Sequence, residues 1–476
     1  MRNIIIIFVI SLLFSSCSKN LESLNTNTKD ATQADAGAFF AYAVKWTSDA
    51  MQTITYGTTG DPFSISRFLT QQVSCNTYTD GTNYFTQFTW SSWYSNVVNN
   101  LAAAKTVVAA TAPIDQAGTI QKKNRTALIE IMNVYAYSKL VEAFGNIPYT
   151  DAGNINNLSP KYDDANTIYT DLFKRLYSAI DSLNTTGTGF GSYDLVYGDK
   201  IAQWKKFANS LLLQMGLRIM DANPTLGAKA VQDAVAGGVF TGNGDNAQLV
   251  YLNAQPNTNP LWVSLAVGNR QDFIAAAPYV DALNSLNDPR RAVYFTTVNG
   301  NYVGAPYGQP SDYNSFSHFG ALFYTPVLPG ILLDDASVEF FLAEAAERGI
   351  LGSPADAESH YNAAIRASFA YYSVTGVDAY LTQPSVAYTT AAGDWKQKIG
   401  MQKWLALFNQ GPEAWTEYRR LDWPKLTAPK NAFVNIVPVR LLYPSTEQTL
   451  NGANWKAAST AIGGDLMTTK LFWDKF

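Results

Sequence analysis

Cysteine and histidine are rare in this sequence: its 476 residues include two of each. The cysteines are Cys17 and Cys75, and the histidines are His318 and His360. Because neither histidine lies within metal-ligand spacing of a cysteine or of the other histidine, the sequence predicts no zinc site, and we expect no cofactor. The N-terminal sequence predicts that Cys17 carries a lipid, which would leave Cys75 without a partner for a disulfide bond. We therefore expect the hydrophobic core, without a disulfide, to stabilise the fold.

Charged residues are also scarce. Lys, Arg, Asp and Glu make up 15% of the chain, and the formal net charge is −4; an average soluble protein has about 25% charged residues. No basic stripe or run occurs, so there is no electrostatic reason to expect a nucleic-acid partner. Polarity comes instead from Asn, Gln, Ser, Thr and Tyr, whose side chains suit hydrogen bonding to neutral polyhydroxyl ligands.

Hydrophobic runs long enough to cross a membrane are absent. One short apolar run covers residues 4–14, broken by Ser11 and preceded by Arg2. As a helix this run would rise only ~16 Å, whereas a bilayer core is ~30 Å thick. A positive residue followed by a short apolar segment is typical of a secretory signal peptide.

Small residues and a cysteine follow this run. Residues 14–17 read Phe-Ser-Ser-Cys and resemble a bacterial lipobox, with Phe14 where leucine is usual. Small side chains allow the backbone into the narrow site of a signal peptidase. We therefore predict a lipoprotein signal peptide at 1–16, lipidation of Cys17 and a flexible tether at 17–34; the alternative is an ordinary signal peptide with a chance cysteine.

Familiar catalytic signatures are missing as well. The sequence has no G-x-S-x-G elbow and no phosphate-binding Gly-Lys-Ser/Thr loop. The adjacent carboxylates Asp334 and Asp335 have the chemistry of an acid/base pair, but charge favoured at a helix N-terminus explains them better. The sequence therefore predicts no catalytic residues.

Beyond residue 34 the sequence reads as helices joined in pairs by short turns. Gly145 followed by Pro148 ends one helix, and Ser353-Pro354 with Asp356 begins another. The expected helices cover 121–144, about 164–183, 204–220, 226–236, 337–349, 353 onward, 394–409 and 412–421. No regular period of ~34 residues is visible. We predict a mostly α-helical scaffold of four or more tetratricopeptide-like helix hairpins.

Residues 239–332, between two helical blocks, have a different composition. They are rich in Asn, Gly, Pro and Tyr, with short alternating runs such as 294–298. Long irregular segments inside a compact domain are often functional. We predict one domain over 35–476 that carries this stretch as a loop-rich insertion; 382–390 and the tail after Pro424 are also expected to be irregular.

Several segments together resemble one family, the SusD/RagB nutrient-binding outer-membrane lipoproteins. They occur in the family's order, and the resemblance runs from Cys17 to Phe476. The matching segments are 127–144 with Gly-Asn-Ile-Pro at 145–148, Trp-Lys-Lys-Phe-Ala-Asn-Ser at 204–210 continuing to Leu217-Arg218, Phe-Phe-Leu-Ala-Glu-Ala-Ala-Glu-Arg-Gly at 340–349, Trp-Thr-Glu-Tyr-Arg-Arg at 415–420, Val-Pro-Val-Arg-Leu-Leu-Tyr-Pro at 437–444, Glu447, Asn451 and Leu-Phe-Trp-Asp at 471–474. The run Asn-Asp-Pro-Arg at 287–290 most resembles the second SusD-like subgroup.

The resemblance implies a role. Proteins of this family are surface lipoproteins that cover a SusC-like TonB-dependent transporter in the outer membrane and capture oligosaccharides or other nutrients without catalysis. Sugars are held by aromatic rings and by amide, carboxylate and arginine groups. The motif residues themselves, such as Glu344, Arg348 and Arg419-Arg420, are expected to be structural, because arginine can hold inter-helix turns through bidentate bonds.

Ligand contacts are expected in loops rather than on helix faces. Trp90 and Trp93 are expected to be structural, since Trp93 shares a helical face with residues further on. The candidate ligand-binding residues in the first loop are Tyr78, Asp80, Asn83, Tyr84 and Phe85, and those in the insertion are Trp262, Asn269, Arg270, Tyr302, Tyr307 and Tyr313. For each aromatic the alternative is ordinary packing.

Other functions remain open at this point. The same scaffold can bind peptide or another non-glycan nutrient, and a purely scaffolding lipoprotein would show no exposed aromatic cluster. A surface glycosidase would need two carboxylates ~5–9.5 Å apart in a cleft.

Overall fold

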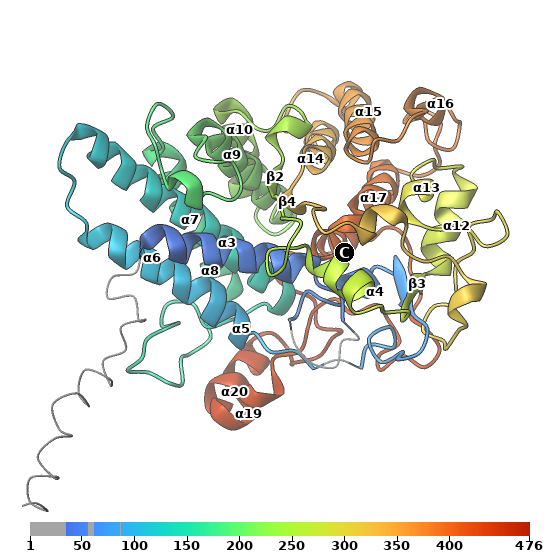
Figure 1. The fold of residues 1–476 in the computed structure, drawn as a ribbon, viewed down its shortest axis with the longest axis horizontal. Helices are drawn as coiled ribbons and strands as arrows, with labels where there is room; N and C mark the ends of the chain where they lie inside the picture. The colour runs from blue at the N-terminus through green and yellow to red at the C-terminus, as the bar shows by residue number, and fades with distance from the viewer. Residues whose placement is uncertain (1–34, 56–60, 86) are drawn as a thin grey trace, which may run out of the picture.

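The structure, a computed structural model, describes residues 35–55, 61–85 and 87–476 (Figure 1). The expected signal peptide, Cys17 and the tether lie outside these residues. The described part of the chain is mostly helical with few strands, which confirms the predicted fold class. In that part, no helix combines the length and the apolar character that a membrane span needs.

Five helix pairs form the scaffold of the described chain. They are α3 (Ala36–Gln52) with α6 (Asn99–Ala110), α7 (Gln116–Phe144) with α8 (Ala165–Ser182), α9 (Ile201–Arg218) with α10 (Pro224–Gly237), α14 (Asp335–Glu347) with α15 (Pro354–Tyr371), and α17 (Trp395–Ala406) with α18 (Gly411–Leu421). Four of these pairs coincide with the helices expected from the sequence. Figure 1 shows that α9, α10, α14 and α15 lie along one edge of the molecule.

Local signals fix the ends of these helices. The Asp164 carboxylate caps α8 by accepting from the backbone N–H of Thr167 at 2.8 Å. A capping box between Ser353 and Asp356 begins α15. Gly145 ends α7 with a φ of 84°, a left-handed conformation that glycine adopts without strain. These ends depend on near neighbours in the chain, which is why the sequence predicts them.

The insertion contains more regular structure than expected. It carries α11 (Pro260–Trp262), a π-helical segment (Val263–Val267), α12 (Ala277–Ser285), α13 (Arg291–Tyr294) and the strands β2 (Ala247–Leu249) and β3 (Phe273–Ala275), with β4 (Gly330–Leu333) at its end. β3 pairs antiparallel with β1 (Val73–Cys75), and β2 pairs antiparallel with β4. The alternating run at 294–298 is not a strand, since Tyr294 closes α13. The β1–β3 pair ties the first loop to the insertion.

The C-terminal tail was expected to be irregular, but it contains two short helices. These are α19 (Ser445–Leu450) and α20 (Gly452–Ala461). Only Ala458 is buried in α20, so neither helix shows a periodic apolar face in the sequence. The other short elements are α4 (Ser66–Leu69), α5 (Ser91–Trp93) with the π-helical segment Tyr94–Val98, α16 (Val377–Leu381), and 3₁₀ turns at Gly191–Tyr193, Asn243–Asp245, Tyr313–Ser315, Ala321–Tyr324 and Leu407–Asn409.

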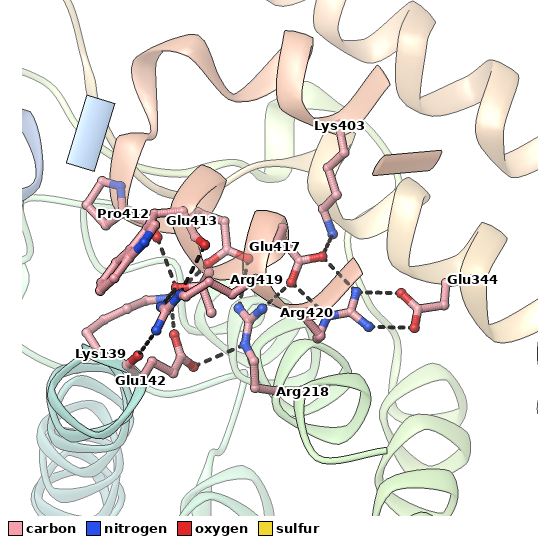
Figure 2. Close-up of polar contacts among 12 residues, drawn as sticks. Lys139, Glu142, Arg218, Glu344, Lys403, Pro412, Glu413, Glu417, Arg419 and Arg420 are labelled. Atoms are coloured by element: carbon pink, nitrogen blue, oxygen red, sulfur yellow. Dashed lines mark hydrogen bonds and ion pairs between the residues drawn. The ribbon is translucent and has the colours of Figure 1, made fainter. Parts of the chain in front are cut away.

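A buried network of ion pairs joins the two helical blocks (Figure 2). Arg218 of α9 lies at its centre, fully buried, and pairs with three carboxylates. These are Glu142 at 3.3 Å, Glu413 at 2.9 Å and Glu417. Arg218 thereby connects α7 and α9 of the first block to α18 of the second.

Further cations complete this network. Lys139 of α7 lies 2.9 Å from Glu413, and Lys403 of α17 lies 2.7 Å from Glu417. Arg420 forms a two-pronged bond to Glu344 of α14. Four cations therefore face four carboxylates on five helices, so no charge in this set is left uncompensated in the interior. The expected structural role of the motif residues is confirmed for Glu344 and Arg420.

Candidate functional site

A cleft of about 640 Å³ opens between the loop after β1 and the C-terminal tail. We call it the main cleft. The loop contributes Asp80, Tyr84, Phe85, Gln87 and Phe88, and the tail contributes Phe433, Leu442, Tyr443, Ser445, Gln448, Trp455, Asp465 and Met467. Sites for small ligands usually measure ~300–1,000 Å³ and combine apolar walls with a few polar groups. The main cleft fits that description.

The loop at 79–85 is held in a fixed conformation. The backbone N–H of Phe85 donates to the Asp80 carbonyl at 2.9 Å. The Asn83 amide donates to the Gly308 carbonyl of the insertion at 2.9 Å, and the Asn83 carbonyl accepts from the N–H of Phe433 at 2.7 Å. Asn83 is thus buried and ties three distant segments together. It positions the cleft wall.

Tyr84 follows with an uncommon backbone conformation. Its φ is 65°, in the left-handed region that side chains rarely adopt, and it is fully buried. Burial raises the pKa of the Tyr84 hydroxyl to about 12, so the phenol stays neutral. Backbone strain of this kind costs ~1–3 kcal/mol and is often retained at ligand sites.

Two exposed phenylalanines line the main cleft. Phe85 is 46% exposed and Phe433 is 56% exposed. Their ring centroids lie 5.4 Å apart with the planes at 64°, an edge-to-face contact. Because each ring is about half exposed, burying the remainder would contribute about half of the ~1.5–3 kcal/mol that full burial of such a side chain gives. Both rings are therefore available to an apolar surface of a ligand. Tyr78, which is 54% exposed, lies nearby in the chain but is not among the cleft residues.

Asp465 organises the tail side of the cleft. Its carboxylate accepts from Arg440 at 2.7 Å, from the backbone N–H of Tyr443 at 3.1 Å and from the indole N–H of Trp455 at 3.1 Å. With both oxygens occupied, Asp465 holds the wall in place. The Tyr443 hydroxyl is buried beside it without a hydrogen-bond partner among the described residues, and burial raises its pKa.

The candidate residues of the insertion are dispersed. Tyr307 donates to the Phe68 carbonyl at 2.6 Å and lines a second cavity, while Tyr313 stacks on His318. Arg270 forms an ion pair with Asp272, and the Tyr302 ring lies under the Arg291 guanidinium. Trp262 is half-buried in α11, whereas Asn269 is exposed and has a φ of 46°. None of the described residues that line the main cleft comes from the insertion. The structure therefore brings together Asp80, Tyr84 and Phe85 but not the two predicted groups as wholes.

The sequence did not indicate the tail side of the cleft. The residues missed there are Phe433, Gln448 and Trp455, together with Gln87 on the loop side. An available signal was the presence of Phe433 and Trp455 in a tail as irregular as the insertion. Trp90 and Trp93, expected to be structural, are indeed buried.

The described residues hold no group of three or more His, Cys, Asp or Glu side chains arranged to bind a metal. Cys75 is buried, and burial raises the pKa of its thiol, so the thiol stays protonated.

Comparisons with known proteins agree on one family. Residues 29–444 match the SusD-like family described as "Starch-binding associating with outer membrane". No curated protein gives a significant match.

Solved structures share the whole fold. A chitin-binding protein superposes with a TM-score of 0.79 at 25% identity, covering 93% of this chain and 100% of its own. A SusD homologue from Bacteroides uniformis gives 0.75 at 26% identity, covering 92% and 99%. A chitin-binding SusD homologue from Flavobacterium johnsoniae gives 0.75 at 24% identity, covering 92% and 98%.

The family match and the superposed structures cover nearly the same part of the chain. Members of this family bind ligands without catalysing a reaction. The chain belongs to the SusD-like family and is a glycan- or nutrient-binding protein that associates with the outer membrane.

Proposed function

We propose that this protein captures an oligosaccharide in the main cleft at the cell surface and passes it to a SusC-like TonB-dependent transporter. A lipid on Cys17 would tether it to the outer membrane. The observation that carries the proposal is the pair of exposed rings, Phe85 and Phe433, beside the polar groups of Asp80, Gln87 and Gln448. A pyranose has one apolar C–H face and a rim of hydroxyls, and the cleft offers a partner to each.

The geometry of the two rings limits how a sugar binds. Because the planes meet at 64°, the pair forms a corner rather than a flat platform. A sugar ring can lie on one phenylalanine and abut the edge of the other. An apolar peptide side chain would fill the same corner, so peptide is the alternative occupant that the experiment must separate.

The choice of ligands to test follows from what the relatives are described as binding. One solved relative at 25% identity is a chitin-binding protein, and the family description names starch. Chito-oligosaccharides and malto-oligosaccharides are therefore the first ligands to test, with a mixture of unstructured peptides beside them.

Changing Phe433 to Ala is expected to weaken oligosaccharide binding about tenfold, since one stacking face is worth ~1.4 kcal/mol or more. Isothermal titration calorimetry of residues 35–476 against both sugar series measures the dissociation constant. Phe476→Ala is the matched control, because Phe476 is similarly exposed (52%) but lies outside the cleft. If only peptides bind, the oligosaccharide proposal is wrong; if Phe433→Ala binds sugar like the wild type, the site lies elsewhere.

Changing Cys17 to Ala is expected to release the protein from the membrane, because the variant has no thiol at this position to carry the lipid. Fractionation of cells that express the wild type and the variant measures the soluble share. A variant that stays in the membrane fraction, even after a high-salt wash that strips protein partners, contradicts a lipid anchor at this residue.

A further inference from the structure

A second cavity, which we call the side cavity, lies behind the wall of the main cleft. It measures about 340 Å³ and is bounded by α12, by Gln71 and by the chain that follows α18. Its polar lining consists of Gln71, Asp281, Tyr307, Lys425 and Thr427. Only Tyr307 among these was a candidate in the sequence. No part of the proposed function uses this cavity.

Two side chains of opposite charge stand in the side cavity. Asp281 belongs to α12 and Lys425 to the segment after α18, and both are exposed. Among the described residues, neither is engaged in an ion pair or a side-chain hydrogen bond. A site for an ion would gather one sign of charge. Lys425 can donate to a ligand hydroxyl and Asp281 can accept from one, and both hydrogen bonds are charge-assisted. Because the two charges are opposite, their electric fields largely cancel, so the pair suits a neutral ligand rich in hydroxyls.

Residues that line the side cavity contact residues that line the main cleft, and we call the residues between the two cavities the wall. The Gln71 amide lines the side cavity, donating to the Thr427 carbonyl at 2.7 Å and to the Tyr84 hydroxyl at 3.4 Å. Tyr84 in turn lines the main cleft. Tyr84 also hydrogen-bonds to Tyr307, which lines the side cavity, so these three side chains and the segment 427–433 connect the linings of the two cavities.

Both wall residues have strained backbones. Gln71 has a φ of 53° and Tyr84 a φ of 65°, and both are buried. Left-handed backbone at such side chains persists only where the surroundings impose it, and it concentrates at ligand sites. The insertion buttresses the same wall, because Gly308 passes so close to Pro429 that a Cβ added to it would lie 2.5 Å from the proline ring.

We infer that the side cavity is a second subsite for the same ligand, a linear neutral oligosaccharide that crosses the segment 427–433. One sugar residue packs on Phe85 and Phe433, and a later residue of the chain hydrogen-bonds to Asp281 and Lys425. The protein would then select chain length as well as sugar type. This inference rests on the proposed function of the main cleft.

The test compares a short ligand with a long one. The probes are chito- and malto-oligosaccharides of two and six units, titrated into the wild type, Asp281→Asn and Lys425→Met. Loss of one charge-assisted hydrogen bond is expected to weaken six-unit binding about tenfold and to leave two-unit binding within about twofold. The control is Lys229→Met, a change at an exposed lysine on α10 that pairs with Asp233 and is not among the residues that line the side cavity.

The binding results distinguish a failure of the side-cavity subsite from a failure of the proposed function. Six-unit chains that bind Asp281→Asn and Lys425→Met as tightly as the wild type overturn the side-cavity subsite while leaving the main cleft intact. Equal weakening for both lengths also overturns it, since the two residues would then act through the main cleft. A wild type that binds neither series overturns the proposed function itself, and the subsite with it. Thermal unfolding of each variant shows whether it is folded.

Discussion

Replacing Arg218 by methionine is expected to lower the free energy of unfolding by about 3–5 kcal/mol. The guanidinium is fully buried and bonds to Glu142, Glu413 and Glu417. Methionine fills similar volume but leaves these carboxylates without their shared counter-charge in an interior that water does not reach. Guanidinium unfolding of the wild type and the variant, followed by circular dichroism, measures the difference.

The matched control is Arg366→Met. Arg366 also pairs with a carboxylate, that of Asp378, but its side chain is 50% exposed and that of Asp378 is 83% exposed. Exposed pairs contribute ~0–1 kcal/mol. If the two variants lose the same stability, the buried network does not hold the helical blocks together in the way inferred.

Acid should weaken the same network. Burial alone would raise the pKa of Glu413, but attraction to Arg218 and Lys139 lowers it to about 2, below the ordinary 4.5. Glu417 is likewise held well below its usual range by Arg420 and Lys403, against the effect of burial. A depressed folded-state pKa contributes stability above the unfolded pKa and loses it as pH falls through the folded value. Wild-type stability should therefore fall between pH 4.5 and 2 more steeply than that of Arg218→Met, which has lost the stabilising cation.

Replacing Trp204 by alanine is expected to cost a comparable ~3–5 kcal/mol. Trp204 is fully buried, with ring centroids 5.6 Å from Tyr197 and 5.8 Å from Phe207. Its indole N–H donates to Asp194 at 2.7 Å. The variant leaves a large cavity and removes one bond from a buried carboxylate. Denaturant unfolding gives the loss directly.

Two further variants give the Trp204 result a clear meaning. Trp204→Phe keeps most of the ring but removes the N–H, so its loss should lie between those of the wild type and the alanine variant. Trp395→Ala removes a half-buried indole beneath the Arg348 guanidinium and should cost only ~1 kcal/mol. A Trp204→Ala loss no larger than that of Trp395→Ala would show that this tryptophan is not a core anchor.

Helix ends were predictable because each depends on a few neighbouring residues. The capping box at Ser353 and the stop at Gly145 both lie where the sequence places them. Pairing across the fold was not predictable. Arg420 and Glu344 could be named as structural, but they are 76 residues apart, and no local pattern identifies one as the partner of the other.

The main cleft shows the same division. Crowded aromatic residues in an irregular loop indicated Tyr84 and Phe85, but the insertion residues chosen by the same criterion lie elsewhere. Even a single pair differs in a way that residue type does not reveal: Tyr307 donates its hydroxyl to a backbone carbonyl, whereas Phe85 stays exposed to solvent. Residue type alone does not distinguish an aromatic side chain that packs in the fold from one that stays exposed at a cleft.

The sequence by itself determined the helical scaffold and the family, because helix periodicity, helix capping and the family segments all depend on residues that are close together in the chain. Only the tertiary structure decided where the proposed binding site forms. The main cleft forms because the loop carrying Phe85 meets a tail more than 300 residues later, held there by the bond from the Phe433 N–H to Asn83. Such a contact depends on the fold of the whole chain, because no local pattern in the sequence relates two segments so far apart.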